Sequence, residues 1–198
     1  MKRILNNSLC LCISLFIIIA VLQGCKRQTD EELLAQMSAG VQAGTFSNQD
    51  QAIDAVGELA GRGNAKAKDP QVVDMLIATG ASLLDNNADW TNPGEARKVY
   101  DAIKKYDDQT IIEGLVRKVI SDEKSRVRVL FLGVKLGIGG TEERLNKILD
   151  EQGDKKMAED FLNSGSQALY EGGKRWAQRH GYTIITGMGS HRVQWGHF

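Results

Sequence analysis

The stretch Val127-Arg-Val-Leu-Phe-Leu-Gly-Val-Lys-Leu136 decides the fold class of this sequence. As an α-helix it would be apolar on nearly every side, which is typical of a helix buried in a protein core. Its β-branched and aromatic residues also permit a strand over 127–134. Because the neighbouring segments have helical patterns, a helix is the favoured prediction, and we expect it to be the most buried helix of the chain.

Amphipathic helical patterns lie on both sides of this stretch. Apolar residues recur there at the three- and four-residue spacing of one helix face. Two clear sets are Ile111, Ile112, Leu115, Val116 and Val119, and Leu145, Ile148 and Leu149. Together with their boundary residues, the patterns predict helices near 49–62, 70–85, 93–105, 109–120, 122–136, 142–151, 155–164 and 167–180.

Capping residues mark the ends of these helices. Both prolines follow a capping residue, in Asp69-Pro70 and Asn92-Pro93. Proline suits the first helical position because its missing N–H would have no partner there. Further marks are two predicted starts, Ser121 and Thr141, each before two acidic residues, and two predicted stops, Gly137 and Gly181.

The predicted helices form an all-α domain in which short connections favour antiparallel pairs. Gly57-Glu-Leu-Ala-Gly61 and Gly133-Val-Lys-Leu-Gly137 each close an apolar helix, and the second copy follows Asp122-Glu-Lys-Ser-Arg-Val-Arg128. This arrangement resembles the HEAT repeat, with its turn Asp, its Val-Arg pair and its Leu-Gly helix end. The resemblance implies helix pairs stacked as a short HEAT-like α-solenoid. An irregular helical bundle is the alternative, because the spacing between pairs is not constant.

The N-terminus has the pattern of an export signal. Lys2 and Arg3 precede an uncharged run over 9–22, which is too short for a membrane-spanning helix of about 20 apolar residues. The run ends in Leu22-Gln-Gly-Cys25, which resembles the lipobox of bacterial lipoproteins. The resemblance implies that residues 1–24 are removed and that the Cys25 thiol carries acyl chains. An uncleaved anchor and an ordinary signal peptide are the alternatives.

The remainder divides into a tether, a domain and a tail. We expect the tether over 25–47, with a short helix started by a capping box in Thr29-Asp-Glu-Glu32. The HEAT-like domain follows over 48–181, and a glycine- and aromatic-rich tail over 182–198. Thr183-Ile-Ile-Thr186 in this tail is a candidate short strand.

Charge and cysteine content exclude several function classes. Basic and acidic residues are equal at 25 each, so the chain lacks the basic excess that nucleic-acid binding requires. Cys10 and Cys12 lie in the predicted signal, and the lipobox resemblance implies that Cys25 would be consumed by lipid. The mature domain therefore has no cysteine for a disulfide, a thiolate metal site or a nucleophile.

Catalytic motifs are lacking in the sequence. It contains no phosphate-binding Gly-Lys-Ser/Thr loop, no dinucleotide fingerprint and no His-Glu-x-x-His pair. Gly187-Met-Gly-Ser-His191 resembles a nucleophile turn only superficially, because it lies in a glycine-rich tail with no preceding strand of the required kind. We expect no enzyme, although carboxylates that meet only in space need no motif.

One segment matches the opening of a calcium loop. Asp85, Asn87 and Asp89 place oxygen ligands at the first, third and fifth positions. Trp90 stands where such loops carry glycine, and Ala96 stands where a bidentate acid closes the site. The alternative is a polar connection between helices, which Asp and Asn also suit.

The tail offers a candidate protein-binding element in Arg192, Trp195 and Phe198, since Arg and aromatic residues dominate binding hot spots. The alternative is a strap packed on the last helix beside Trp176. A metal site from His180, His191 and His197 is less favoured, because their spacing matches no ligand motif.

These features favour a membrane-anchored adaptor or assembly factor of the bacterial cell envelope. Its partners would be the membrane, through lipid on Cys25, and an envelope protein, and no cofactor is expected unless calcium binds. A small-ligand or calcium-binding lipoprotein and an enzyme with a carboxylate site are the alternatives. The domain would lie outside the cytoplasm, on the cell membrane or, as Lys26 after the anchor favours, on the outer membrane.

Overall fold

The structure is a computed structural model that describes residues 27–46, 49–84, 95–186 and 193–197. These residues form nine α-helices, a short 3-10 helix and a two-stranded hairpin. The helices are α2 (Asp30–Gln42), α3 (Asp50–Gly61), η1 (Ala65–Lys68, 3-10), α4 (Pro70–Ser82), α5 (Glu95–Ile103), α6 (Asp108–Ser121), α7 (Arg126–Leu136), α8 (Thr141–Gln152), α9 (Lys155–Leu162) and α10 (Gln167–Arg179). The strands are β1 (Tyr182–Thr186) and β2 (Val193–His197).

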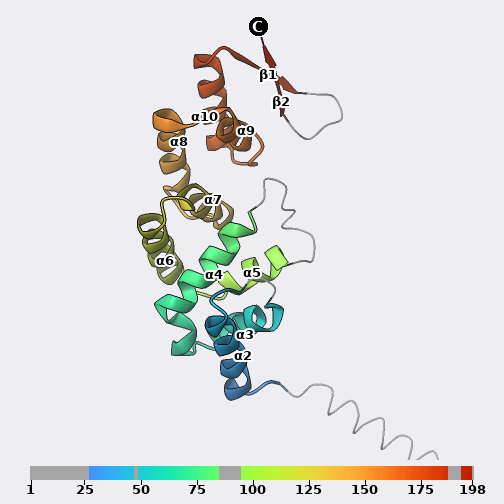
Figure 1. The fold of residues 1–198 in the computed structure, drawn as a ribbon, viewed down its shortest axis with the longest axis vertical. Helices are drawn as coiled ribbons and strands as arrows, with labels where there is room; N and C mark the ends of the chain where they lie inside the picture. Colours follow the sequence, from blue (N-terminus) through green and yellow to red (C-terminus); the bar gives the residue numbers. More distant parts are fainter. Residues whose placement is uncertain (1–26, 47–48, 85–94, 187–192, 198) are drawn as a thin grey trace, which may run out of the picture.

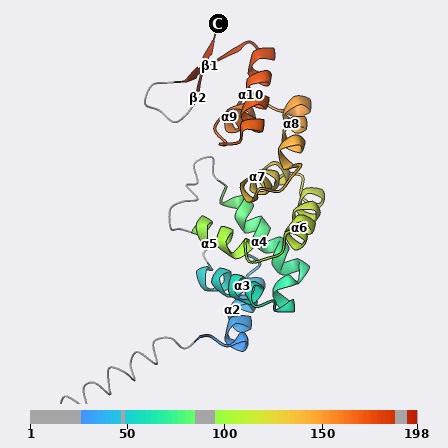
Figure 2. The same cartoon turned by 180° about the vertical axis from the view of Figure 1, so that it is seen from behind.

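The helices pack as adjacent pairs along an elongated array (Figure 1). Sequence neighbours contact each other in α2 with α3, α4 with α5, α6 with α7, and α9 with α10. Contacts of α3 with α5 and of α4 with α6 join one pair to the next. Both Figure 1 and the reverse view in Figure 2 place α2 at one end of the molecule and the hairpin at the other.

The all-α prediction is confirmed, and so is each of the eight predicted helices. Asp69 caps α4 by accepting a hydrogen bond from the Gln71 amide at 2.9 Å, with Pro70 at the first helical position. Gly137 ends α7 in the left-handed conformation at φ 75°, which glycine adopts without steric cost. Asn92-Pro93 lies outside the described residues.

The prediction that a helix starts at Ser121 is wrong. Ser121 is the last residue of α6, and the Asp122 amide donates to the Lys118 carbonyl oxygen at 3.1 Å. The Asp122 carboxylate accepts from the Ser125 amide at 3.2 Å, so it stabilises the turn between two helices. α7 therefore begins four residues later than predicted, at Arg126.

The helix predicted within the tether is present and belongs to the core. Thr29 and Glu32 form the predicted capping box at the start of α2. Leu33, Met37 and the following Phe46 are buried, and α2 packs along α3. α2 thus belongs to the same hydrophobic cluster as α3 and the helices that follow it.

α7 lies between two hydrophobic clusters. Val129, Leu132 and Leu136 belong to the cluster formed with α2 to α6. Leu130 belongs to the cluster formed with α8 to α10, against which Phe131 also packs. Burial on two sides explains why this segment is apolar nearly all round, and the segment is a helix over 127–134 instead of a strand. The prediction that it is the most buried helix is wrong, because α3 and α4, which lie inside the first cluster, have more buried residues.

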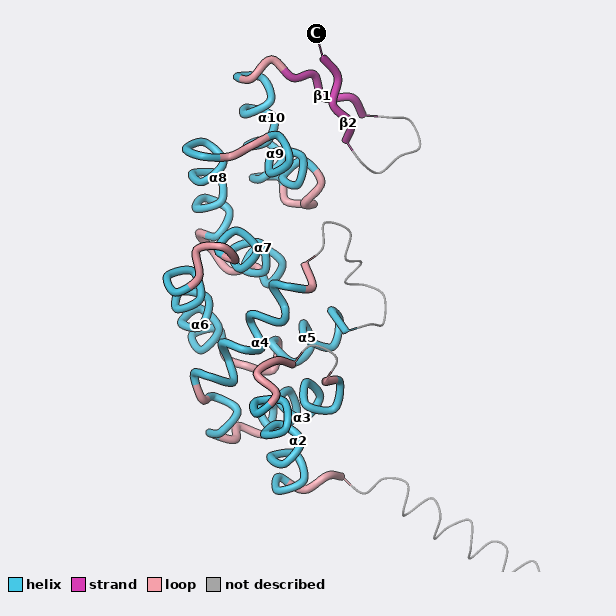
Figure 3. The backbone as a smooth tube through the Cα atoms, in the orientation of Figure 1, coloured by secondary structure: helices cyan, strands magenta, loops and turns pink. Residues whose placement is uncertain are grey.

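The described tail residues form an antiparallel hairpin in which Tyr182 pairs with His197 and Thr186 with Val193. Figure 3 shows this hairpin beside α10, at one end of the helical array. The predicted strand over 183–186 is thereby confirmed, and its partner strand was not predicted.

Candidate functional site

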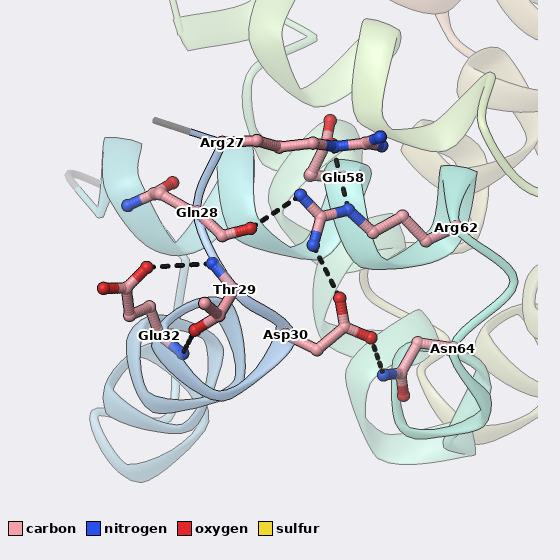
Figure 4. Close-up of polar contacts among 8 residues, drawn as sticks. All are labelled: Arg27, Gln28, Thr29, Asp30, Glu32, Glu58, Arg62 and Asn64. Carbon is pink, nitrogen blue, oxygen red and sulfur yellow. Dashed lines mark hydrogen bonds and ion pairs between the residues drawn. The ribbon is translucent and has the colours of Figure 1, made fainter. Parts of the chain in front are cut away.

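The beginning of the described chain is held by a network of charged and polar groups, drawn in Figure 4. We call this network the N-terminal latch and define it as Arg27, Gln28, Asp30, Glu58, Arg62 and Asn64. Gln28 and Asp30 flank the capping residue of α2, whereas Glu58 lies in the last turn of α3. Arg62 caps the end of α3 and Asn64 caps η1. The latch therefore joins the start of α2 to the α3–η1 corner.

Arg62 is the centre of the latch. Its guanidinium donates to Asp30 Oδ1 at 2.6 Å, to Glu58 Oε1 at 3.1 Å and to the Gln28 carbonyl oxygen at 2.8 Å. Its side chain is only 16% exposed, while those of Asp30 and Glu58 are nearly half exposed. An arginine fork suits this role because it holds several acceptors in fixed directions.

Two further contacts complete the latch. The Arg27 guanidinium donates to Glu58 Oε1 at 3.2 Å, and the Asn64 amide donates to Asp30 Oδ2 at 3.0 Å. Each carboxylate of the latch thus has two side-chain donors. Arg62 and Asn64 together hold both oxygens of Asp30.

Electrostatics keep these groups charged. Hydrogen bonds from Arg62 and then Asn64 lower the pKa of Asp30, and those from Arg27 and then Arg62 lower the pKa of Glu58. The hydrogen bond to Asp30 raises the pKa of Arg62. A general acid needs a carboxyl pKa raised toward neutrality. The latch has the opposite shift, so its arrangement suits attachment of the chain start and not proton transfer.

A shallow groove of about 290 Å³ lies between α3 and α5. It is lined by Ile53, Asp54, Gly57, Glu58, Lys98, Asp101, Ala102 and Lys105. Lys98 spans it, bonding Asp50 at 2.8 Å and approaching Asp54 at 3.7 Å. The hydrogen bond to Asp50 raises the pKa of Lys98. Ion pairs across the groove join α3 to α5, which also explains its charged lining.

An apolar stripe is exposed on α6. Ile112, Val116 and Ile120 recur at four-residue spacing and are 37%, 41% and 75% exposed. The opposite side of the helix, with Ile111 and Leu115, is buried against its neighbours. The sequence grouped Ile112 and Val116 with the buried face, because an apolar pattern alone does not show how much of a helix its neighbours cover.

Aromatic rings join the hairpin to the last helix. Trp176 of α10 stacks on His180 with centroids 3.9 Å apart, and on Tyr182 of β1 with centroids 5.8 Å apart. A ring nitrogen of His180 lies 2.7 Å from the Trp176 carbonyl oxygen. These contacts place Tyr182, the first residue of the tail, against the last helix beside Trp176, as in the alternative in which the tail packs as a strap.

Of the sequence-predicted site residues, one lies in the described part of the chain. Cys25, the calcium candidates Asp85, Asn87 and Asp89, and Arg192 and Phe198 lie outside the described residues. Trp195 lies in β2, where it pairs with Ile184. The part of the chain that the structure describes contains no group of three His, Cys, Asp or Glu residues that could hold a metal.

The latch was missed by sequence reasoning. Its one local signal is the four-residue spacing of Glu58 and Arg62, which places an acid and a base on one helix face. The contact of Arg62 with Asp30 joins residues far apart in sequence, and no local pattern marks it.

None of the helices in the described part of the chain has the length and apolar content needed to cross a membrane. Comparison with known proteins gives no family: no family model, no curated protein and no solved structure matches this chain.

Proposed function

We propose that this protein is a lipid-anchored adaptor of the bacterial cell envelope, in which a HEAT-like helical domain presents a protein-binding face. The observation that carries the proposal is the apolar stripe on α6. Soluble proteins rarely leave contiguous apolar side chains exposed unless the surface binds a partner. Anchoring through Cys25 adds a second element, since it would hold this face close to other envelope proteins.

The sequence before the domain supports the anchoring half of the proposal. An uncharged run over 9–22 leads to Leu22-Gln-Gly-Cys25, and the thiol of Cys25 is the group that can form a thioether with lipid. Several acyl chains bind a membrane stably, whereas one chain binds marginally, at about 0.8 kcal/mol per buried methylene.

Metabolic labelling with an alkyne fatty acid tests the anchoring half. The native chain should incorporate label and fractionate with membranes, and Cys25→Ser should lose both properties. Cys10→Ser is the matched control, since this cysteine lies in the signal and should leave labelling unchanged. Equal labelling of Cys25→Ser and the native chain would refute anchoring through Cys25.

The shape of the stripe supports the adaptor half. Three side chains at four-residue spacing form an apolar ridge along α6, and such a ridge packs into the groove between side chains of a partner helix. The occupant we propose is an amphipathic helix of an envelope protein. Stacked helix pairs typically create extended surfaces that suit protein partners.

Site-specific photocrosslinking in cells tests the adaptor half. A benzophenone amino acid at Ile120 should give one adduct of defined mass, and the same amino acid at Lys147 of α8 should not. Lys147 is the matched control because its side chain is also highly exposed and lies on a polar helix face.

A second substitution ties the adduct to the stripe. Val116→Asp, one helical turn from the crosslinker, should remove the adduct because a charge would be desolvated in the contact. Equal crosslinking at Ile120 and Lys147, or an adduct that survives Val116→Asp, would contradict the proposal.

A further inference from the structure

The latch lies next to the proposed anchor. Arg27 is the second residue after Cys25, so only Lys26 separates the anchor from the first residue of the latch. A chain advances at most about 3.6 Å per residue, which places the Cα atom of Arg27 within about 7 Å of that of Cys25. If Cys25 carries lipid, the contacts of Arg27 in the latch therefore also determine the position of the domain relative to that lipid.

We propose that the N-terminal latch fixes the orientation of the domain on the membrane, with the latch end against the lipid headgroups and the hairpin end pointing away. The inference rests on the proposed lipidation of Cys25. Beyond that lipidation, the inference states which surface of the domain contacts the membrane, namely the surface of the latch end.

The contacts of the latch restrain the chain start in direction as well as position. Arg62 donates hydrogen bonds to the Gln28 carbonyl oxygen and to the Asp30 carboxylate. These two residues lie two positions apart in the segment that leads into α2. Glu58 Oε1 accepts from both Arg27 and Arg62. Figure 4 shows these groups converging from the start of α2 and the end of α3. Because both helices belong to the core, residues 27–30 are held to the whole domain.

The latch end is polar, which suits headgroups and not the acyl layer. Arg27 is 75% exposed, and η1, which adjoins the latch through Asn64, carries exposed Lys66 and Lys68. The exposed large apolar side chains of the described residues are Ile112, Val116, Ile120 and Ile185, all on α6 or β1. Insertion of the latch end into the acyl layer is therefore disfavoured.

Charge alone would not orient the molecule. Asp30 and Glu58 neutralise the arginines of the latch, and Asp107 pairs with Lys68 at 2.7 Å. The end is thus balanced, whereas attraction to an anionic surface needs an excess of cations. In this arrangement the acyl chains supply the affinity, and the latch supplies the direction.

The arrangement gives the two ends of the molecule different surroundings. Figures 1 and 2 place α2 and the hairpin at opposite ends, with α6 between them. A fixed orientation would hold the stripe on α6 at a constant height above the lipid, within reach of partners anchored in the same membrane.

Energy transfer to a labelled membrane tests the orientation. The chain from Cys25 onward, which contains every described residue, is coupled through Cys25 to a maleimide phospholipid. It is placed on vesicles of phosphatidylethanolamine and phosphatidylglycerol that carry a rhodamine lipid. A donor dye is attached through a ketone amino acid at Lys66, on η1, or at Gln178, near the end of α10. We expect several-fold higher transfer from position 66 than from position 178.

Two variants test the latch itself. Arg62→Ala should remove most of the difference between the two dye positions, and Arg97→Ala should leave it unchanged. Arg97 is a matched control because it forms an exposed pair with Asp101 within α5 alone. Circular dichroism shows whether Arg62→Ala remains folded. A glycine–serine insertion between Cys25 and Lys26 leaves the latch intact and should also reduce the difference.

Equal transfer from both positions in the native sequence would overturn the inference, because the domain would then tumble on its anchor. An unchanged difference in folded Arg62→Ala would also overturn it. Coupling through maleimide makes this test independent of the cell. If Cys25 is not acylated in vivo but the coupled chain is oriented, the proposed anchoring fails while the property of the latch stands.

Discussion

At the residue scale, a few side chains join segments that are distant in sequence. Tyr106 is buried, and its hydroxyl donates to the Ala67 carbonyl oxygen at 2.9 Å, which joins the end of α5 to η1. Burial raises the pKa of Tyr106, so the hydroxyl stays protonated and remains a donor. Gly114 of α6 acts through the side chain that it lacks, because the absence of a Cβ atom lets α6 approach α4 closely.

Tyr106→Phe should lower the free energy of unfolding by about 1–3 kcal/mol, since it leaves the buried Ala67 carbonyl without this donor. Urea denaturation followed by circular dichroism measures the loss. Tyr170→Phe, at a half-buried position in α10, is the control for deletion of a hydroxyl. Equal stability of Tyr106→Phe and the native chain would mean that water replaces the bond.

Gly114→Ala should lower the free energy of unfolding by about 1–3 kcal/mol, the usual cost of overfilling a packed contact. A Cβ atom on Gly114 would lie 2.5 Å from Ile77 Cδ1 and 2.8 Å from Val73 Cγ1, so these packed side chains or the two helices must shift. Gly139→Ala is the control, because a Cβ there meets nothing within 4 Å. Thermal melting of both variants checks the prediction, and equal melting temperatures would contradict it.

At the element scale, α7 is the helix that connects the two hydrophobic clusters. Leu132 is fully buried in the cluster formed with α2 to α6, and Leu130 is buried in the cluster formed with α8 to α10. Lys135 also donates to the Ser164 carbonyl oxygen at 2.9 Å, in the connection before α10. A helix shared in this way couples the unfolding of the two parts.

Leu132→Ala should destabilise the chain by about 2–5 kcal/mol through the cavity that it leaves. Because α7 is shared, its effect should also reach α10, although Leu132 lies in the other cluster. Hydrogen exchange measured by mass spectrometry should show faster exchange in both α3 and α10. Leu130→Ala is the complementary variant and should give the same pattern; faster exchange confined to one side would show that the clusters unfold separately.

At the scale of the whole molecule, the latch attaches the chain start to the folded array and makes this attachment sensitive to pH. The pKa values of Asp30 and Glu58 are lowered from their ordinary values of 3.8 and 4.5. A carboxylate with a lowered pKa in the folded state contributes stability above its ordinary pKa, and this contribution is lost as the pH falls. The latch should therefore open in acid and remain closed at neutral pH.

The melting temperature of the native chain should fall as the pH is lowered from about 5 to about 3. The melting temperature of Asp30→Asn should fall less over the same pH range. The variant has already lost the charge whose protonation opens the latch. High salt should likewise reduce the difference between the two chains, because exposed ion pairs are screened. Parallel pH profiles for the variant and the native chain would show that Asp30 contributes nothing to acid sensitivity.

The sequence by itself determined the helices and the fold class. Apolar spacing and local caps act within a few residues, so Asp69-Pro70, the Thr29 capping box and Gly137 could be recognised without a structure. The prediction of a helix start at Ser121 was wrong because the acid that follows it, Asp122, caps the turn after α6 and not a new helix. Which of the two an acid caps depends on where the next helix packs. The anchoring of Cys25 and the calcium and tail sites stay predictions.

Only the tertiary structure decided which surfaces remain free and which distant charges meet. Ile111 and Ile112 are alike in sequence, yet α4 and its neighbours cover the first and leave the second 37% exposed. Arg62 and Asp30 meet because packing of α2 on α3 places them together. Burial and long-range ion pairs depend on how helices stack, and a local pattern contains no information on that stacking.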